Sequence, residues 1–126
     1  MKRYIVSQKL NDIIVNNIPK SNSNEIKVIW IADEHKELPD DVIRKYFGNY
    51  VHPKYCTYAT IEVNGDRFPV AFQDYREGRK QKIFVYSEPI WNFIKDKRTP
   101  EQQAFIDSHL KEISDACLKK QGRGRY

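Results

Sequence analysis

The sequence predicts an α+β fold, with a mixed or antiparallel sheet of about five strands and helices packed mainly on one face. Alternating apolar and polar residues over 55–86 indicate a three-stranded meander. An apolar run over 25–32 indicates another strand, and apolar residues at helical spacing after Thr99 indicate a long amphipathic helix. Together these give the order strand, helix, strand, helix, three strands, helix, helix.

Residues 2–6 are expected to form a short strand, and helical spacing predicts an amphipathic helix over 8–18 that Pro19 ends. The strand over 25–32 is apolar on both of its faces, which is typical of a central strand covered on both sides. A short helix then begins near Pro39, with acidic residues in its first turn and Gly48 as its stop.

The meander has a local signal that sets its register. Asn64-Gly65 separates two alternating runs, and both residues of a type I′ turn need positive φ. A two-residue loop at this position pairs Val63 with Asp66, and the pairs that follow are Ile61–Phe68, Ala59–Val70 and Thr57–Phe72. Pro69 cannot donate to a ladder, so it should lie at an edge or point away from its partner strand.

The last third of the chain is expected to be helical. A short helix should start at 87–89, and Thr99, Pro100 and Gln102 predict a capped helix that runs to about Lys120 and stops at Gly122. The chain of 126 residues has the length of one domain, so we expect a single domain over 1–120 and a flexible basic tail over 121–126.

Net charge is +5, and its placement is uneven. Residues 1–66 contain nine Lys/Arg and nine Asp/Glu, whereas residues 67–126 contain thirteen and eight. The second half therefore supplies the whole excess, which indicates an anionic partner or a basic but merely solvated surface. No apolar run reaches the length of a membrane span and no signal-peptide core is present, so we expect a cytoplasmic protein without membrane contact.

Three basic clusters contain the candidate binding residues. Guanidinium and ammonium groups beside aromatic rings can hold phosphates and stack bases. The candidates for nucleic-acid or phosphate binding are Arg76, Arg79, Lys80, Lys82, Lys97, Arg98, Arg123 and Arg125. The candidates for base stacking are Tyr75, Phe84 and Tyr86. A covering helix is the competing explanation for the last two rings, and the apolar stripe over 105–113 is the expected cover.

Catalytic signals are weaker. Asp33, Glu34 and His35 follow a buried strand, where carboxylates and an imidazole can bind a divalent metal, but acidic loop residues are more often only solvated. The two cysteines, Cys56 and Cys117, form no C-x-x-C motif and are expected to be free thiols. No phosphate-loop, dinucleotide or nucleophile-elbow motif is present, so the sequence favours a non-enzymatic protein without a cofactor.

The favoured function is a small binding protein whose basic surface docks on nucleic acid or a nucleoprotein complex. One alternative is a virus- or mobile-element-encoded inhibitor of a host defence protein or of its nucleotide ligand. Another is a metal-dependent nuclease, and a third is a nucleotide pocket at a dimer interface with Arg76 and Arg79 at the phosphate. The sequence does not determine the oligomeric state, and a homodimer is compatible with it.

Overall fold

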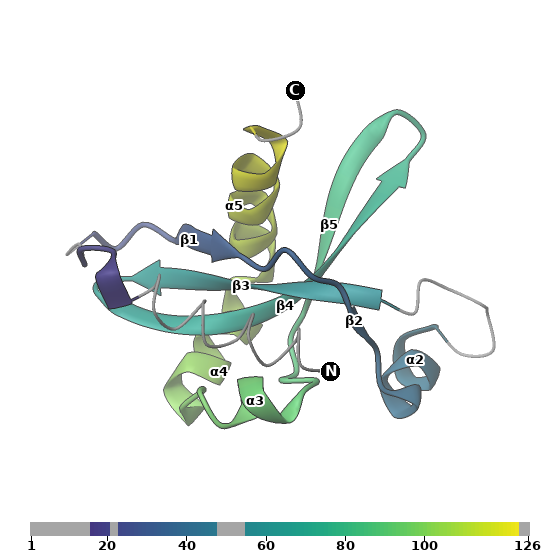
Figure 1. Ribbon diagram of the computed structural model, residues 1–126, viewed down its shortest axis with the longest axis horizontal. Coiled ribbons are helices and arrows are strands. Elements are labelled where there is room, and N and C mark those ends of the chain that lie inside the picture. Colours follow the sequence, from purple (N-terminus) through teal and green to yellow (C-terminus); the bar gives the residue numbers. More distant parts are fainter. Residues whose placement is uncertain (1–15, 21–22, 48–54, 124–126) are drawn as a thin grey trace.

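The computed structural model describes residues 16–20, 23–47 and 55–123. The predicted strand over 2–6, most of the predicted helix over 8–18, and Gly48 lie outside these ranges. The described ranges contain one antiparallel sheet of five strands, which confirms the α+β class (Figure 1). The strands are β1 (Lys27–Ile31), β2 (Lys36–Glu37), β3 (Tyr55–Val63), β4 (Asp66–Glu77) and β5 (Lys80–Tyr86). No helix within the described ranges is long and apolar enough to cross a membrane.

The β3–β4 hairpin has the predicted register. Asn64 and Gly65 both have positive φ, 52° and 82°, as a type I′ turn requires. All four predicted pairs, from Val63–Asp66 to Thr57–Phe72, are present. β4 pairs with β5 only from Ala71 onward, so Pro69 lies where β3 is the sole neighbour described for β4. Pro69 has no N–H to donate, and on the β5 side no described strand is present that would need one.

Gly65→Val should lower the free energy of unfolding by about 1–3 kcal/mol, because a β-branched residue resists positive φ. Gly65→Asn is the matched control, since asparagine tolerates this conformation, and it should cost less. Urea denaturation of both variants measures the difference. Equal stability of Gly65→Val and the parent protein would contradict the hairpin assignment.

Among the described strands, β1 pairs only with β3 and lies at an edge of the sheet, so the predicted central position is not found there. The strand order is β1-β3-β4-β5, and β2 also pairs with β3, further along that strand. A register shift between Val28 and Trp30 interrupts the β1–β3 ladder and changes which residues share a face. β1 is apolar on both faces because both of its faces are covered. Val28 packs in the core under α5, and Trp30 contacts Tyr58 on the other face.

The helices are α2 (Asp40–Phe47), α3 (Asn92–Lys95), α4 (Pro100–Ser108) and α5 (Leu110–Arg123). The capping box at Thr99 is confirmed, with hydrogen bonds in both directions between Thr99 and Gln102. Two predictions need correction. The long helix is broken at His109, whose backbone has φ −129° and ψ 29°, and α3 starts at Asn92 instead of at 87–89.

The sheet is covered on both faces, and the two longest helices share one of them. On the first face, Ile61, Phe72 and Val85 pack against Ile106 of α4 and Ile113 of α5. On the second face, Tyr58, Ala71 and Tyr86 form a separate cluster. Val42 of α2 and Ile94 of α3 complete that second cluster. The outer ends of β4 and β5 reach beyond both layers (Figure 1).

Candidate functional site

The outer parts of β4 and β5 leave the sheet as a two-stranded hairpin, here called the arm (residues 73–84; Figure 1). Its turn contains Gly78, whose φ of 66° favours glycine. A Cβ added there would meet no atom within 4 Å, so the tip is open on its outer side. The antiparallel ladder continues to Glu77–Lys80, directly before the turn, which gives the arm a defined shape despite its exposure.

The arm contains four basic and two acidic residues, and the two acids are already engaged. Asp74 accepts hydrogen bonds from the amides of Gln81 (3.1 Å) and Gln121 (2.9 Å). The Glu77 carboxylate forms an ion pair with Lys82. The other three cations, Arg76, Arg79 and Lys80, are exposed and have no carboxylate partner within the part of the chain that the structure describes. Positive charge is therefore concentrated at the end of the arm.

The ladder places the arm residues on two different faces. Tyr75 is opposite Lys82 and Gln73 is opposite Phe84, so these four residues lie on the second face of the sheet. Arg76 is opposite Gln81 and lies on the first face, on the side of α5. The structure therefore groups the two aromatic candidates with Lys82 but separates them from Arg76.

Two of the three stacking candidates are exposed. The Tyr75 residue is 41% exposed and Phe84 is 38% exposed. Tyr86 is wrong as a stacking candidate, because it is 0% exposed and its hydroxyl donates to Gln73 Oε1 at 2.7 Å. The helix that covers Tyr86 is α2, through an edge contact with Tyr46 at 5.3 Å between ring centroids. The stripe over 105–113, the predicted cover, packs on the first face instead.

The remaining basic candidates do not join the arm. Lys97 is exposed, but it lies in the connection between α3 and α4. These two helices lie below the sheet in the view of Figure 1, whereas the arm projects above it. The guanidinium nitrogens of Arg98 are buried, so Arg98 is wrong as a surface contact. Arg123 is the last residue of α5, and Arg125 lies outside the described residues. The predicted tail is therefore helical for its first half, and Gln121 ties it to the arm through Asp74.

Arg98 has an unusual environment. Within the described part of the chain, no group accepts a hydrogen bond from its Nε or Nη atoms. Burial lowers its pKa to about 10, and the negative charge of Asp107 partly offsets that effect. Burial removes water from the guanidinium group, and no hydrogen bonds to the described residues replace that water. Arg98 therefore lowers the free energy of unfolding.

Arg98→Met should raise the free energy of unfolding by about 1–3 kcal/mol, because it removes a desolvated and unsatisfied group while keeping an unbranched apolar stem. Lys97→Met is the matched control at an exposed neighbouring position, where we expect a change within about 0.5 kcal/mol. Thermal or urea unfolding gives both values. A loss of stability in Arg98→Met would show that the guanidinium makes a favourable interaction in the folded protein.

The metal candidates Asp33, Glu34 and His35 belong to no metal-binding group among the described residues. No group of three His, Cys, Asp or Glu side chains able to hold a metal occurs within the described residues. The carboxylates at the two ends of the meander are also occupied, because Asp66 accepts from Gln102 at 2.9 Å and Asp74 accepts from two amides. Within the described residues, no converging carboxylates of the kind a metal-dependent nuclease needs are found.

Lys36 is a residue whose environment sequence reasoning did not anticipate. Its Nζ lies 5.5 Å from the ring centroid of Trp91 and 4.9 Å from that of Phe93. Burial lowers the pKa of Lys36 to about 8. Cys56, its partner across the β2–β3 ladder, is buried, and burial raises the pKa of that thiol to about 12. The thiol is therefore protonated near neutral pH and poorly suited to nucleophilic attack.

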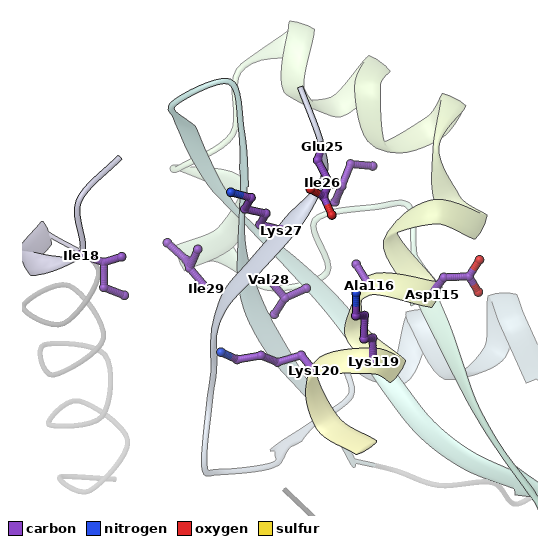
Figure 2. A pocket seen from close by; sticks show the side chains of 10 residues that line it. All are labelled: Ile18, Glu25, Ile26, Lys27, Val28, Ile29, Asp115, Ala116, Lys119 and Lys120. Carbon is purple, nitrogen blue, oxygen red and sulfur yellow. The ribbon is translucent and has the colours of Figure 1, made fainter. Parts of the chain in front are cut away.

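A groove of about 680 Å³ lies between β1 and α5 (Figure 2). Val28 points from β1 toward α5, whereas Lys27 and Ile29 leave the strand on its other side. Lys119 and Lys120 of α5 line the groove together with the acidic Asp115 and Glu25. Because its charged residues are of both signs, the groove offers no consistent field for an anion or a cation.

Comparisons with protein-family models, curated proteins and solved structures find no match to this chain.

Proposed function

We propose that this protein is a non-enzymatic nucleic-acid-binding protein and that the arm provides its binding surface. The observation that supports this most strongly is the chemistry of the arm, where Arg76, Arg79 and Lys80 are exposed and lack carboxylate partners among the described residues. Exposed cations on a projecting hairpin can follow a phosphate backbone, and such contacts supply most of the affinity in nucleic-acid binding. The two exposed rings add surfaces on which bases can stack.

The sequence-wide charge agrees with this proposal. The excess of positive charge begins after Asp66, and the arm alone contributes two net positive charges, from four bases and two acids. Long-range attraction from such a surface accelerates association with polyanions. A reducing compartment such as the cytoplasm suits the two free, buried cysteines. A nucleoprotein complex remains within the proposal, since phosphates presented there would meet the same cations.

The direct test is the affinity of the full chain for single- and double-stranded RNA and DNA, measured by fluorescence anisotropy at about 50 and about 200 mM salt. We expect binding that weakens steeply between the two salt concentrations, because each phosphate contact releases counterions. No binding of any strand at the lower salt concentration would overturn the proposal and would favour a protein partner.

A further inference from the structure

We propose that the second face of the arm is a stacking platform for two unpaired bases of a single-stranded nucleic acid, with Tyr75 and Phe84 as the two rings. This inference depends on the nucleic-acid binding proposed above and names the form of nucleic acid that the arm accepts. It also assigns a role to Glu77, which forms an ion pair with Lys82, the neighbour of both rings.

The register determines how the two rings are placed. Tyr75 is opposite Lys82 and Phe84 is opposite Gln73, which makes Tyr75 and Phe84 diagonal neighbours on one face. Diagonal neighbours in an antiparallel pair are roughly 7–8 Å apart. Successive bases in a duplex strand are only about 3.4 Å apart along the axis. One base on each ring therefore requires bases that have separated from one another, which a single strand permits and a duplex resists.

Phe84 is supported on its inner side and open on its outer side. Its ring contacts the rings of Tyr86 at 4.8 Å and Tyr46 at 5.9 Å, both edge-on, and the residue is still 38% exposed. The hydroxyl of Tyr46 donates to Glu88 at 2.9 Å, which holds that supporting ring in place. A ring fixed from behind loses little conformational entropy when a base stacks on it.

Lys82 is a neighbour of both rings and already has an anionic partner. It is directly opposite Tyr75 and two residues from Phe84 on the same face, and its ammonium pairs with the Glu77 carboxylate. Both side chains are exposed, at 41% for Lys82 and 67% for Glu77, so water screens the pair and exchange is easy. A phosphate between two stacked bases would take the place of that carboxylate. Glu77 thus competes with the ligand for Lys82.

The experiment compares a short oligothymidylate, its duplex with oligoadenylate, and an abasic strand of the same length, at one fixed salt concentration. The abasic strand keeps the phosphates and lacks the bases. The variants are Tyr75→Leu, Phe84→Leu and Glu77→Gln, because leucine keeps apolar bulk for packing and glutamine keeps the shape of glutamate. Tyr55→Leu is the control, since Tyr55 is the most exposed aromatic of the described chain, at 54%, and lies outside the arm.

We expect the parent protein to bind oligothymidylate more tightly than the abasic strand or the duplex. Tyr75→Leu and Phe84→Leu should each weaken oligothymidylate binding by roughly 5- to 150-fold and leave abasic binding nearly unchanged. Glu77→Gln should tighten binding to both single strands, and Tyr55→Leu should change nothing.

Equal affinity for the three probes, with both leucine variants unaffected, would overturn the platform while leaving phosphate binding by the arm intact. The absence of binding to any probe would instead overturn the proposed function itself. The two failures are therefore distinguishable within one set of measurements.

Discussion

Replacing Arg67 with alanine should lower the free energy of unfolding by about 3–5 kcal/mol, because it removes the guanidinium that pairs with the buried Glu62 carboxylate. Arg67 Nε lies 2.7 Å from Glu62 Oε2, and the two side chains are only 8% and 3% exposed. Arg67 also donates from Nη2 to the carbonyl of Ile18 at 2.6 Å. The substitution therefore removes both the ion pair with Glu62 and the hydrogen bond to the Ile18 carbonyl. Urea denaturation measures the loss.

The control is an ion pair of the same kind at the surface. Lys111 and Asp115 on α5 are separated by 3.3 Å but are 87% and 65% exposed, so Lys111→Ala should cost no more than about 0.5 kcal/mol. The double variant Glu62→Leu/Arg67→Met should recover much of the lost stability, since it removes both charges of the buried pair. A loss below about 1 kcal/mol in Arg67→Ala would contradict the burial of this pair.

The triple variant Arg76→Ala/Arg79→Ala/Lys80→Ala should show the largest loss of binding. Each phosphate contact on a single strand contributes about 0.7 to the slope of log affinity against log salt, so three lost contacts lower that slope by about 2. If the affinities converge near 1 M salt, the loss at about 50 mM is roughly a few hundredfold. Anisotropy titrations over a salt series give both quantities. Folding should be retained, because all three residues are exposed.

A control variant that loses the same number of charges distinguishes direct contact by the arm from attraction by the overall charge of the protein. Lys95, Lys111 and Lys119 are exposed basic residues on α3 and α5, outside the arm, and their replacement by alanine removes the same three charges. We expect this control to lose much less affinity at every salt concentration. Similar losses in the two triple variants would mean that the protein attracts nucleic acid through its overall charge, and that the arm is not the contact surface.

The features that sequence reasoning predicted correctly are the ones that local chemistry determines. Asn64-Gly65 requires a type I′ turn, and the turn sets the register of the hairpin for several residues on either side. The Thr99–Gln102 capping box likewise involves residues within a single helical turn. Neither feature needs information about which distant segment lies nearby.

The features that sequence reasoning missed depend on tertiary contacts with segments that are distant in the sequence. Phe84 and Tyr86 occupy equivalent positions in the alternating pattern of β5. Nevertheless, α2 buries Tyr86 and leaves Phe84 partly exposed. The break at His109 is hidden because α4 and α5 both face the same side of the sheet, so the apolar spacing continues across it. Arg98 looks like its basic neighbours in the sequence, and only the tertiary structure buries it.

Ultraviolet crosslinking of the full chain to a single-stranded oligonucleotide would show whether the arm is the contact surface. The adducts are located by mass spectrometry of tryptic peptides. Tyr75 lies in peptide 68–76 and Phe84 lies in peptide 83–95, so the two rings are read separately. We predict adducts at both rings and none at Tyr55, which lies in peptide 55–67. Adducts confined to peptides outside the arm would show that the arm is not the nucleic-acid contact surface.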